Sequence, residues 1–475
     1  MNRRFLRGSL LRACPALLGL VAVALIGCPA PSQSDAAVEE FEIPADRVVV
    51  DTRPVGPDGQ PPSDVSDIDA TLARDGSAVG DGATRDGADG ATVPPRDVVE
   101  DTTATMGLDV TVPDASFGVQ PCSLAATPVA FGAGGRGSRP VYVRSNFTGF
   151  QASATVLREG ADNVWLQRVD RDGAPVLVGN ITGRAVGRAV RGGSFAQDSM
   201  FYSVVWAETV AGVDSIGFRR MQSNFLEVGG SEQVLATGPS LQQPEIVQTP
   251  AGLLVIWRAI ESGRGILRGV SLTSVSVGTV TDITGPTDNV GEFRLVGSVD
   301  ADVYAVAWRN AATPSIQVTP LRSTGAAAMA PLSVATGADL GPSVDATLED
   351  DGDVWVSFAR PADSAAVRFR RITLAAGDGT SAELSVPSTM GAQDVAVALD
   401  TPGIVLAWRA PTRTPASIDL ARIDAAGTVR DTSRVVPSGP GGRPGIAAGG
   451  GGYGLGWTDD AASGAITRIA AVHCR

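Results

Sequence analysis

The chain has 475 residues, of which 43% are hydrophobic and 19% charged, and its formal net charge at pH 7 is −13. This length exceeds what one small core needs, so more than one region is expected. The sequence has no lysine, one histidine and four cysteines. This composition excludes Schiff-base chemistry on lysine and offers too few His and Cys ligands for a zinc site, so it predicts neither a metal site nor a cofactor.

The negative charge is concentrated in one segment. Residues 1–27 carry a net charge of +4, residues 28–121 carry −14, and residues 122–475 carry only −3. Binding of nucleic acid requires a positive field. Because the largest region is close to neutral, the sequence predicts no nucleic-acid partner.

The N-terminus has the pattern of an export signal. Four arginines and no acid precede or flank an apolar run from Ala16 to Ile26. This run is too short for a membrane span and has the basic start of a secretory signal peptide. It ends in Leu25-Ile26-Gly27-Cys28, which resembles the lipobox of bacterial lipoproteins. The resemblance implies removal of residues 1–27, lipidation of Cys28, and a membrane partner held through that lipid.

The residue after the lipidated cysteine indicates in which membrane the protein is anchored. Pro29 stands where enterobacterial lipoproteins that stay in the inner membrane carry Asp. The resemblance therefore implies an exported protein anchored in the outer membrane by its lipid. The domain would face the periplasm or the cell surface.

Residues 28–121 are rich in Asp, Pro, Gly, Ala, Ser and Thr and have few aromatic residues. Stretches such as 81–90, an Asp-Gly-rich segment, cannot bury enough apolar surface to offset the loss of chain entropy. The Asp-Gly pairs lack the fixed nine-residue period of calcium-binding repeats. We expect a disordered acidic linker that acts as a tether.

After residue 121 the sequence changes to short β-rich runs separated by Gly, Pro and Asp. Apolar runs that end in an aromatic residue recur, as in Leu253–Trp257 and Ile404–Trp408. The aromatic positions are 206, 257, 308, 358, 408 and 457, with spacings of 51, 51, 50, 50 and 49 residues. A period near 50 residues in an all-β chain is typical of propeller blades.

Each repeat divides into four strands, A to D in chain order. In the repeat around Trp257 they are expected at 245–248, 253–257, 266–272 and 279–283. A divergent seventh repeat begins at Val141, and the last repeat ends without a strand D. The segment Leu124 to Phe131 is expected to supply that strand and to close the ring without an exposed edge. Residues 122–475 are thus predicted to form an all-β, seven-bladed β-propeller; six blades with an N-terminal cap, or a row of β-sandwiches, are the alternatives.

Cys14 would be removed with the signal peptide and Cys28 would carry the lipid, which leaves two cysteines. Cys122 and Cys474 would lie on adjacent strands of the closing blade. Because an exported protein meets an oxidising compartment, we expect a disulfide between them.

Four arginines form a candidate ligand-binding ring. Arg258, Arg309 and Arg409 each follow the strand B Trp, and Arg360 comes two residues after Phe358. The topology places them at the start of the B–C loops on one face, where they would attract an anionic ligand such as an acidic glycan. The alternative is local pairing with loop acids, or packing of the arginine stems over Trp.

Loop carboxylates offer a different chemistry, because two of them at a suitable separation make a glycosidase. No spacing singles out a pair, so no catalytic residue is assigned. The acids expected on the D–A and B–C loops are Glu208, Glu261, Asp288, Glu292, Asp339, Asp363, Asp394, Asp459 and Asp460. The segment Asp350–Trp355 resembles the Asp box of sialidase-like propellers, but it occurs once, in an A–B turn, and predicts a simple β-turn. His473 is expected to be a packed strand residue.

Taken together, the lipobox, the tether and the repeat resemble the propeller lipoproteins of Gram-negative, high-GC bacteria. This resemblance implies no activity. The sequence favours a non-catalytic binding or scaffold module at the envelope, with a glycan or protein ligand on the propeller face. A carbohydrate-active enzyme that uses loop carboxylates, or a structural component of an outer-membrane complex, is the alternative.

Overall fold

The computed structural model describes residues 122–134, 141–146, 148–158, 161–182, 188–198, 200–274, 276–376, 379–412, 416–436, 443–459 and 466–474. The signal peptide, the lipidation site Cys28 and the linker predicted for residues 1–121 lie outside the described residues. Within the described part of the chain, no helix has the length and apolarity to cross a bilayer.

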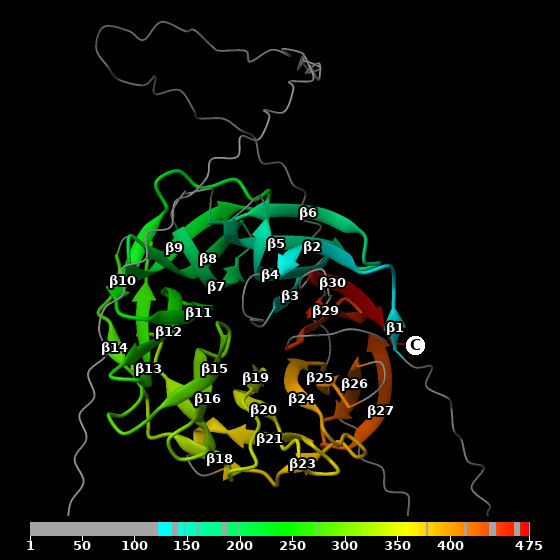
Figure 1. The fold of residues 1–475 in the computed structure, drawn as a ribbon. Helices are drawn as coiled ribbons and strands as arrows, with labels where there is room; N and C mark the ends of the chain where they lie inside the picture. The colour runs from blue at the N-terminus through cyan, green and yellow to red at the C-terminus, as the bar shows by residue number, and fades with distance from the viewer. Residues whose placement is uncertain are drawn as a thin grey trace, which may run out of the picture. The chain divides into compact units, whose positions relative to one another are not determined.

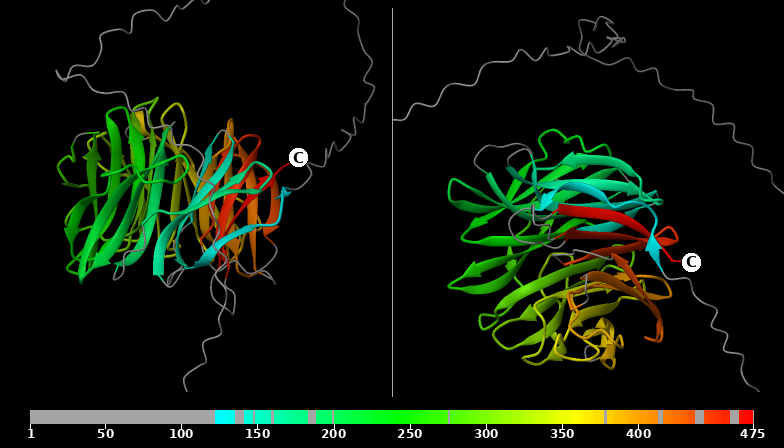
Figure 2. Two further views of the ribbon diagram at one scale, coloured as in Figure 1. Left: turned by 90° about the horizontal axis from the view of Figure 1, so that it is seen from above. Right: turned by 45° about the vertical axis from the view of Figure 1, so that its right-hand side comes forward.

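The described residues form seven small antiparallel sheets arranged as blades in a ring, which is a seven-bladed β-propeller (Figure 1). An edge-on view shows the sheets standing side by side around the ring (Figure 2). The fold class predicted from the 50-residue period is confirmed, and the six-bladed alternative is wrong.

Each blade has its first strand innermost and its last strand outermost. Blade 1 has β3 (Tyr142–Asn146), β4 (Gly149–Arg158), β5 (Ala161–Asp170) and β6 (Pro175–Asn180); blade 2 has β7 (Arg188–Gln197), β8 (Phe201–Val210), β9 (Val213–Gln222) and β10 (Gln233–Gly238). Blade 3 has β11 (Leu241–Thr249), β12 (Gly252–Glu261), β13 (Arg264–Leu272) and β14 (Thr281–Asp282); blade 4 has β15 (Val290–Ser298), β16 (Val303–Asn310), β17 (Ser315–Leu321) and β18 (Leu332–Thr336).

The remaining blades follow the same order. Blade 5 has β19 (Val344–Leu348), β20 (Asp353–Ala359), β21 (Val367–Thr373), the short helix η1 (Leu374–Ala376), β22 (Gly379–Thr380) and β23 (Leu384–Ser385). Blade 6 has β24 (Gln393–Leu399), β25 (Gly403–Ala410), β26 (Ser417–Asp424) and β27 (Val429–Val436); blade 7 has β28 (Gly445–Gly449), β29 (Gly452–Asp459), β30 (Ile466–His473) and two N-terminal strands, β1 (Ser123–Leu124) and β2 (Val129–Gly134).

The second strand of each blade is apolar on both faces because both faces meet a neighbouring blade. Ile256 of β12 shares a hydrophobic cluster with Trp308 of blade 4, whereas Trp257 packs against Val205 and Ile216 of blade 2. The six tryptophans at 206, 257, 308, 355, 408 and 457 are 0–2% exposed. The recurring aromatic residue therefore fills the space between blades, and its burial contributes to the stability of the ring.

The N-terminus closes the ring, as predicted, but with an interrupted strand. β1 and β2 both pair with β30, and residues 125–128 between them belong to no strand. The last two residues of β2 also pair with β4, so the first and last blades form one continuous sheet. The predicted disulfide joins Cys122 to Cys474 beside β1. The backbone N–H of Cys122 also donates to Ser433 Oγ of blade 6 at 2.9 Å.

Candidate functional site

Charged residues lie within otherwise apolar inner strands. Glu245 lies on β11, Arg294 on β15 and Asp345 on β19. These three side chains line one small cavity, so residues from three blades converge at the axis of the ring. A β-bulge directly precedes Glu245, and bulges commonly re-aim a side chain near a functional site.

Two of these carboxylates join the inner strands of neighbouring blades. An inner strand has no strand partner on its axial side, and its buried N–H groups need other acceptors. Glu245 Oε2 accepts a hydrogen bond from the backbone N–H of Leu295 at 2.7 Å. Asp345 Oδ2 accepts one from Val397 at 3.0 Å. These acids therefore have a structural part in holding blades 3 and 4, and blades 5 and 6, together.

The same acids belong to a larger group, here called the axial ionic cluster, which consists of Tyr142, Glu245, Glu292, Arg294, Asp345 and Arg443. Tyr142 Oη donates to Glu245 Oε1 at 2.8 Å. Arg294 Nε lies 3.1 Å from Asp345 Oδ1. Arg443 Nη1 lies 2.7 Å from Glu292 Oε2, and its Nη2 lies 3.4 Å from Asp345 Oδ1. The cluster links blades 1, 3, 4, 5 and 7 across the axis.

The pKa shifts in the cluster follow from burial and from these pairs. Burial alone acts to lower the pKa of Arg294 and Arg443, but the combined attraction of Asp345 and the other nearby acids outweighs it and raises both pKa values. Burial raises the pKa of Glu245 and of Tyr142, and their mutual contact raises the pKa of Tyr142 further. The small cavity among these side chains has room for about 10 Å³, so the cluster closes this part of the axis.

The rest of the axis is open. A cavity of about 860 Å³, here called the axial cavity, is lined by the later halves of the inner strands and by the A–B turns. Its polar wall includes Arg144, Gln197, Gln248 and Thr347. Arg294 lines both the axial cavity and the small cavity of the cluster, so it lies at the boundary between them.

Arg144 on β3 differs from the two arginines of the cluster. Its Nη2 donates to the carbonyl of Ile246 at 3.1 Å, and its guanidinium lies 5.9 Å from the ring centroid of Phe195. Among the described residues it has no carboxylate at ion-pair distance. Burial, and then the nearby charge of Arg294, lower the pKa of Arg144 to about 10. Arg144 is therefore a cation at neutral pH that faces the axial cavity with most of its N–H donors available.

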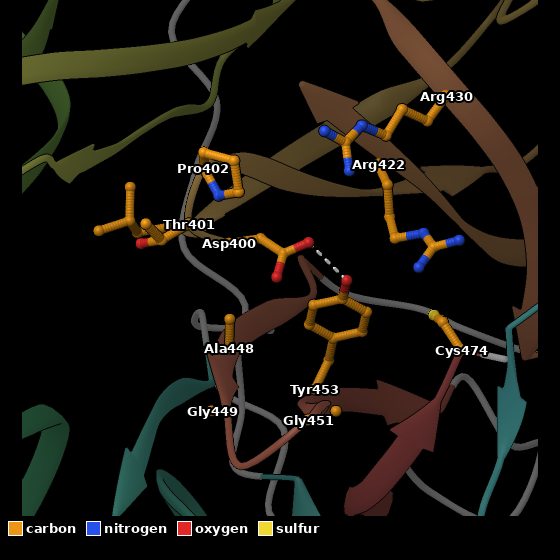
Figure 3. Close-up of a pocket in the computed structure, with 12 residues that line it drawn as sticks. Asp400, Thr401, Pro402, Arg422, Arg430, Ala448, Gly449, Gly451, Tyr453 and Cys474 are labelled. Atoms are coloured by element: carbon orange, nitrogen blue, oxygen red, sulfur yellow. Dashed lines mark hydrogen bonds between the residues drawn. The ribbon is translucent and has the colours of Figure 1, made fainter. Parts of the chain in front are cut away.

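A second pocket, of about 460 Å³, lies between blades 6 and 7 (Figure 3). Its wall includes Asp400, Arg422, Arg430, Tyr453 and Cys474. Tyr453 Oη donates to Asp400 Oδ2 at 2.7 Å, and Arg422 Nε donates to Asp431 Oδ2 at 2.8 Å. Most of its polar groups are thus already engaged with each other, which makes this pocket the weaker candidate.

The predicted arginine ring is spread over blades 3 to 6. The strands run past the Trp positions, so Arg258, Arg309 and Arg409 lie within β12, β16 and β25 and not at the start of loops. Arg258 and Arg309 come together at Gly291: Arg258 Nη1 donates to the Gly291 carbonyl, and Arg309 Nη1 lies 3.7 Å from where a Cβ on Gly291 would stand. The structure shows no such meeting for Arg360 and Arg409.

Three of the four ring arginines have local polar partners. Arg258 Nη2 donates to Gln242 Oε1 at 3.0 Å, and burial lowers the pKa of Arg258. Arg409 Nε donates to Asp394 Oδ2 at 2.9 Å. Arg360 lies 2.7 Å from Asp339 and 3.1 Å from Glu383, and these bonds raise its pKa against the opposing effect of burial. Arg309 has no ion-pair partner in the described part of the chain. Ligand binding by this ring stays a prediction.

The loop carboxylates are engaged rather than free. Six of them pair with an arginine: Glu261 with Arg268, Glu292 with Arg443, Asp339 with Arg360, Asp363 with Arg368, Asp394 with Arg409, and Asp459 with Arg468. Asp288 accepts hydrogen bonds from Gly285 N–H at 2.7 Å and Asn310 Nδ2 at 3.0 Å. Glu208 is 4% exposed and also has a partner, and Asp460 lies outside the described residues. The hydrogen bonds from Arg360 lower the pKa of Asp339, which makes this carboxyl group a poor general acid.

Two smaller predictions concern turns and the closing strand. Residues 349–352 form the A–B turn of blade 5, where Gly352 has φ +92°. Glu349, Asp351 and Asp353 gather beside this turn, but Arg371 contacts all three. His473 lies at the end of β30, where its Nε2 is 2.9 Å from the Arg171 carbonyl.

Glu292 was named among the candidate loop acids, but the other residues of the axial ionic cluster and Arg144 were not predicted as part of a site. Their signal in the sequence is a charged residue inside an apolar first strand, as in Glu245-Ile246-Val247 and Phe293-Arg294-Leu295. Since the first strand of a blade is the innermost, such a residue faces either a neighbouring blade or the axis.

The chain matches no protein-family model and no curated protein. Among solved structures, it is similar to a family PL25 polysaccharide lyase, an ulvan lyase, with a TM-score of 0.50 and 8% identity over 72% of this chain and 95% of that chain. It is also similar to the polysaccharide lyase Uly1 (TM-score 0.42, 9% identity, 70% and 89% covered) and to the SapL1 lectin (TM-score 0.40, 12% identity, 65% and 98% covered). At these identities the similarity shows the propeller fold and nothing about activity.

Proposed function

We propose that this protein is an exported, lipid-anchored binding module of the cell envelope that takes its ligand in the axial cavity. The lipobox ending at Cys28 and the acidic segment 28–121 support the anchor and the tether. The Cys122–Cys474 disulfide is consistent with an oxidising compartment.

The axial cavity is the observation that carries this proposal. Its volume of about 860 Å³ lies within the usual range of small-molecule sites, roughly 300–1,000 Å³. Its wall comes from strands of a ring closed by sheet pairing and a disulfide. Polar groups on such strands are held in place, so little ordering is needed when a ligand binds.

Binding is favoured over carbohydrate hydrolysis by the state of the carboxylates. A glycosidase needs one carboxyl group that can donate a proton and a second that acts as a base or nucleophile. The described loop acids are engaged in the pairs reported above. Glu245 has a raised pKa, but it lies 4% exposed in the closed part of the axis, where a sugar has no room.

The cavity is tested with a variant that fills it. Thr347, a half-buried residue of β19, lines the cavity, whereas Thr432 is exposed on the outer strand β27. We expect Thr347→Trp to abolish binding of glycans to the full-length chain on a glycan array, and Thr432→Trp to leave it unchanged. New reducing ends released from a bound polysaccharide would instead support the enzyme alternative. Equal binding by both variants would refute the cavity as the site.

The anchor is tested separately. Cys28→Ala should move the full-length protein from the membrane fraction to the soluble fraction of the producing cells, and the lipid mass on the N-terminal peptide should disappear. A protein that remains in the membrane fraction without Cys28 would refute lipid anchoring.

A further inference from the structure

We propose that the axial cavity selects an anionic saccharide and that Arg144 binds its carboxylate or sulfate group. This inference deepens the proposed function and depends on the axial cavity being the binding site.

The first argument is the set of open donors on Arg144. A guanidinium has five N–H donors in a planar fork that matches a carboxylate or a sulfate. The described contacts of Arg144 use one of them, for the carbonyl of Ile246. Arg144 is half-buried and lines the axial cavity, so its remaining donors face a space that a ligand can fill.

The second argument is the contrast among the three arginines at the axis. Arg294 contacts Asp345, and Arg443 contacts both Glu292 and Asp345. Arg294 repels Arg144, and the attractions of Glu245 and Tyr142 for Arg144 are each weaker than this repulsion. A cation that lies beside another cation and has no counter-ion in contact favours the binding of an anionic ligand.

The rest of the wall suits the hydroxyl groups of a sugar. Gln248 and Thr347 line the cavity, and their side chains make no hydrogen bond within the described residues. Amide and hydroxyl groups can both donate and accept, as sugar hydroxyls do. The cavity acids Asp198 and Asp300 lie at the A–B turns of blades 2 and 4, and Asp198 is already paired with Arg220 at 3.1 Å. Arg144 lies on β3 of blade 1, so neither acid is on its strand.

The test uses neutral, uronic-acid and sulfated oligosaccharides on a glycan array, followed by calorimetric titration of the tightest. The full-length chain is compared with Arg144→Gln, which keeps the size but removes the charge, and with Arg144→Lys, which keeps the charge but removes the fork. Arg264→Gln is the matched control, because Arg264 also donates to a backbone carbonyl, that of Pro286, has no ion-pair partner in the described part of the chain and does not line the cavity. The unfolding temperature of each variant checks that the ring is intact.

We expect the native chain and Arg264→Gln to bind an acidic saccharide equally. Arg144→Gln should bind it at least about tenfold more weakly, the range of one hydrogen bond to a charged group. Arg144→Lys should be intermediate. Comparison of uronic-acid with sulfated ligands identifies which anion is bound.

The outcomes separate this inference from the proposed function. Binding of neutral sugars only, lost in Thr347→Trp, would overturn the role of Arg144 and leave the cavity as the site. Acidic ligands bound equally by Arg144→Gln would do the same. Binding that survives Thr347→Trp, or no binding to any glycan, would overturn both.

Discussion

At the scale of single residues, the axis of the ring separates two uses of arginine. Arg443 lies 8% exposed between Glu292 and Asp345 and also donates to the Val344 carbonyl at 2.6 Å. It holds blade 7 against blades 4 and 5. Arg144 has no carboxylate partner among the described residues and lines the axial cavity. The same residue type therefore has a structural role at one level of the axis and an available charge at the next.

This difference predicts opposite effects on stability. Arg443→Gln leaves Glu292 without its cation and Asp345 with Arg294 alone, and loss of one partner from a buried pair costs roughly 3 kcal/mol. Arg144→Gln should leave the free energy of unfolding at pH 7 unchanged or higher. The folded-state pKa of Arg144, about 10, lies below the ordinary pKa of an arginine, so the charged form is disfavoured by folding. That unfavourable contribution is fully present well below pH 10 and declines as the pH rises through this value.

Urea unfolding of the full-length chain and both variants at pH 7 measures these effects. A large loss of stability in Arg144→Gln would mean that Arg144 has a structural role like that of Arg443. It would also remove the contrast on which its ligand-binding role depends.

At the scale of single elements, the second strand of each blade is the repeating unit of the core. A tryptophan is buried on this strand in blades 2 to 7, but the surroundings of its indole N–H differ from blade to blade. Trp308 Nε1 donates to Thr319 Oγ1 at 2.9 Å, whereas Trp257 Nε1 has no hydrogen-bond partner within the described residues. Both side chains are at most 1% exposed.

Substitution by Phe separates packing from hydrogen bonding in this strand. Trp257→Phe removes volume only, whereas Trp308→Phe also leaves the fully buried Thr319 hydroxyl without its donor. We expect Trp308→Phe to lower the free energy of unfolding by about 1 kcal/mol more than Trp257→Phe does. Chemical denaturation of the two variants measures the difference. In the double variant Trp308→Phe/Thr319→Val the extra loss should disappear.

The repeat was readable from the sequence because its signal is local. A period near 50 residues and one aromatic residue per unit predicted the blades, and the unpaired last repeat predicted closure by the N-terminus. The strand limits were less exact: β12 continues to Glu261, four residues past Trp257, because side-chain pattern does not mark where hydrogen bonding between strands stops. The gap between β1 and β2 was missed for the same reason.

The candidate site was not readable, because its contacts join residues that are far apart in the chain. Glu292 and Arg443 are 151 residues apart, and Tyr142 and Glu245 are 103 apart. A pattern within one strand shows that a charged residue interrupts an apolar run. It does not show which residue of another blade faces it across the axis.

At the scale of the whole molecule, ring closure determines whether either cavity exists. Blade 7 takes its outer strands from the N-terminus, and β2 continues onto β4 of blade 1. Arg443 enters the axial ionic cluster from the segment just before β28, and Tyr142 enters it from β3 of blade 1. The blades on both sides of the closure thus contribute to the floor of the axial cavity.

Removal of the disulfide tests this dependence. In the chain-entropy view, a disulfide stabilises by limiting the unfolded chain, and the loss of a native one costs roughly 2–5 kcal/mol. We expect Cys122→Ser/Cys474→Ser to be less stable by an amount in this range. Amide hydrogen exchange should rise first in β30, whose pairing with β1 and β2 the disulfide secures, and later in blade 4, which lies far from the closure. Uniform exchange throughout the ring would show that blade 7 has no independent opening, because the ring then unfolds as one unit.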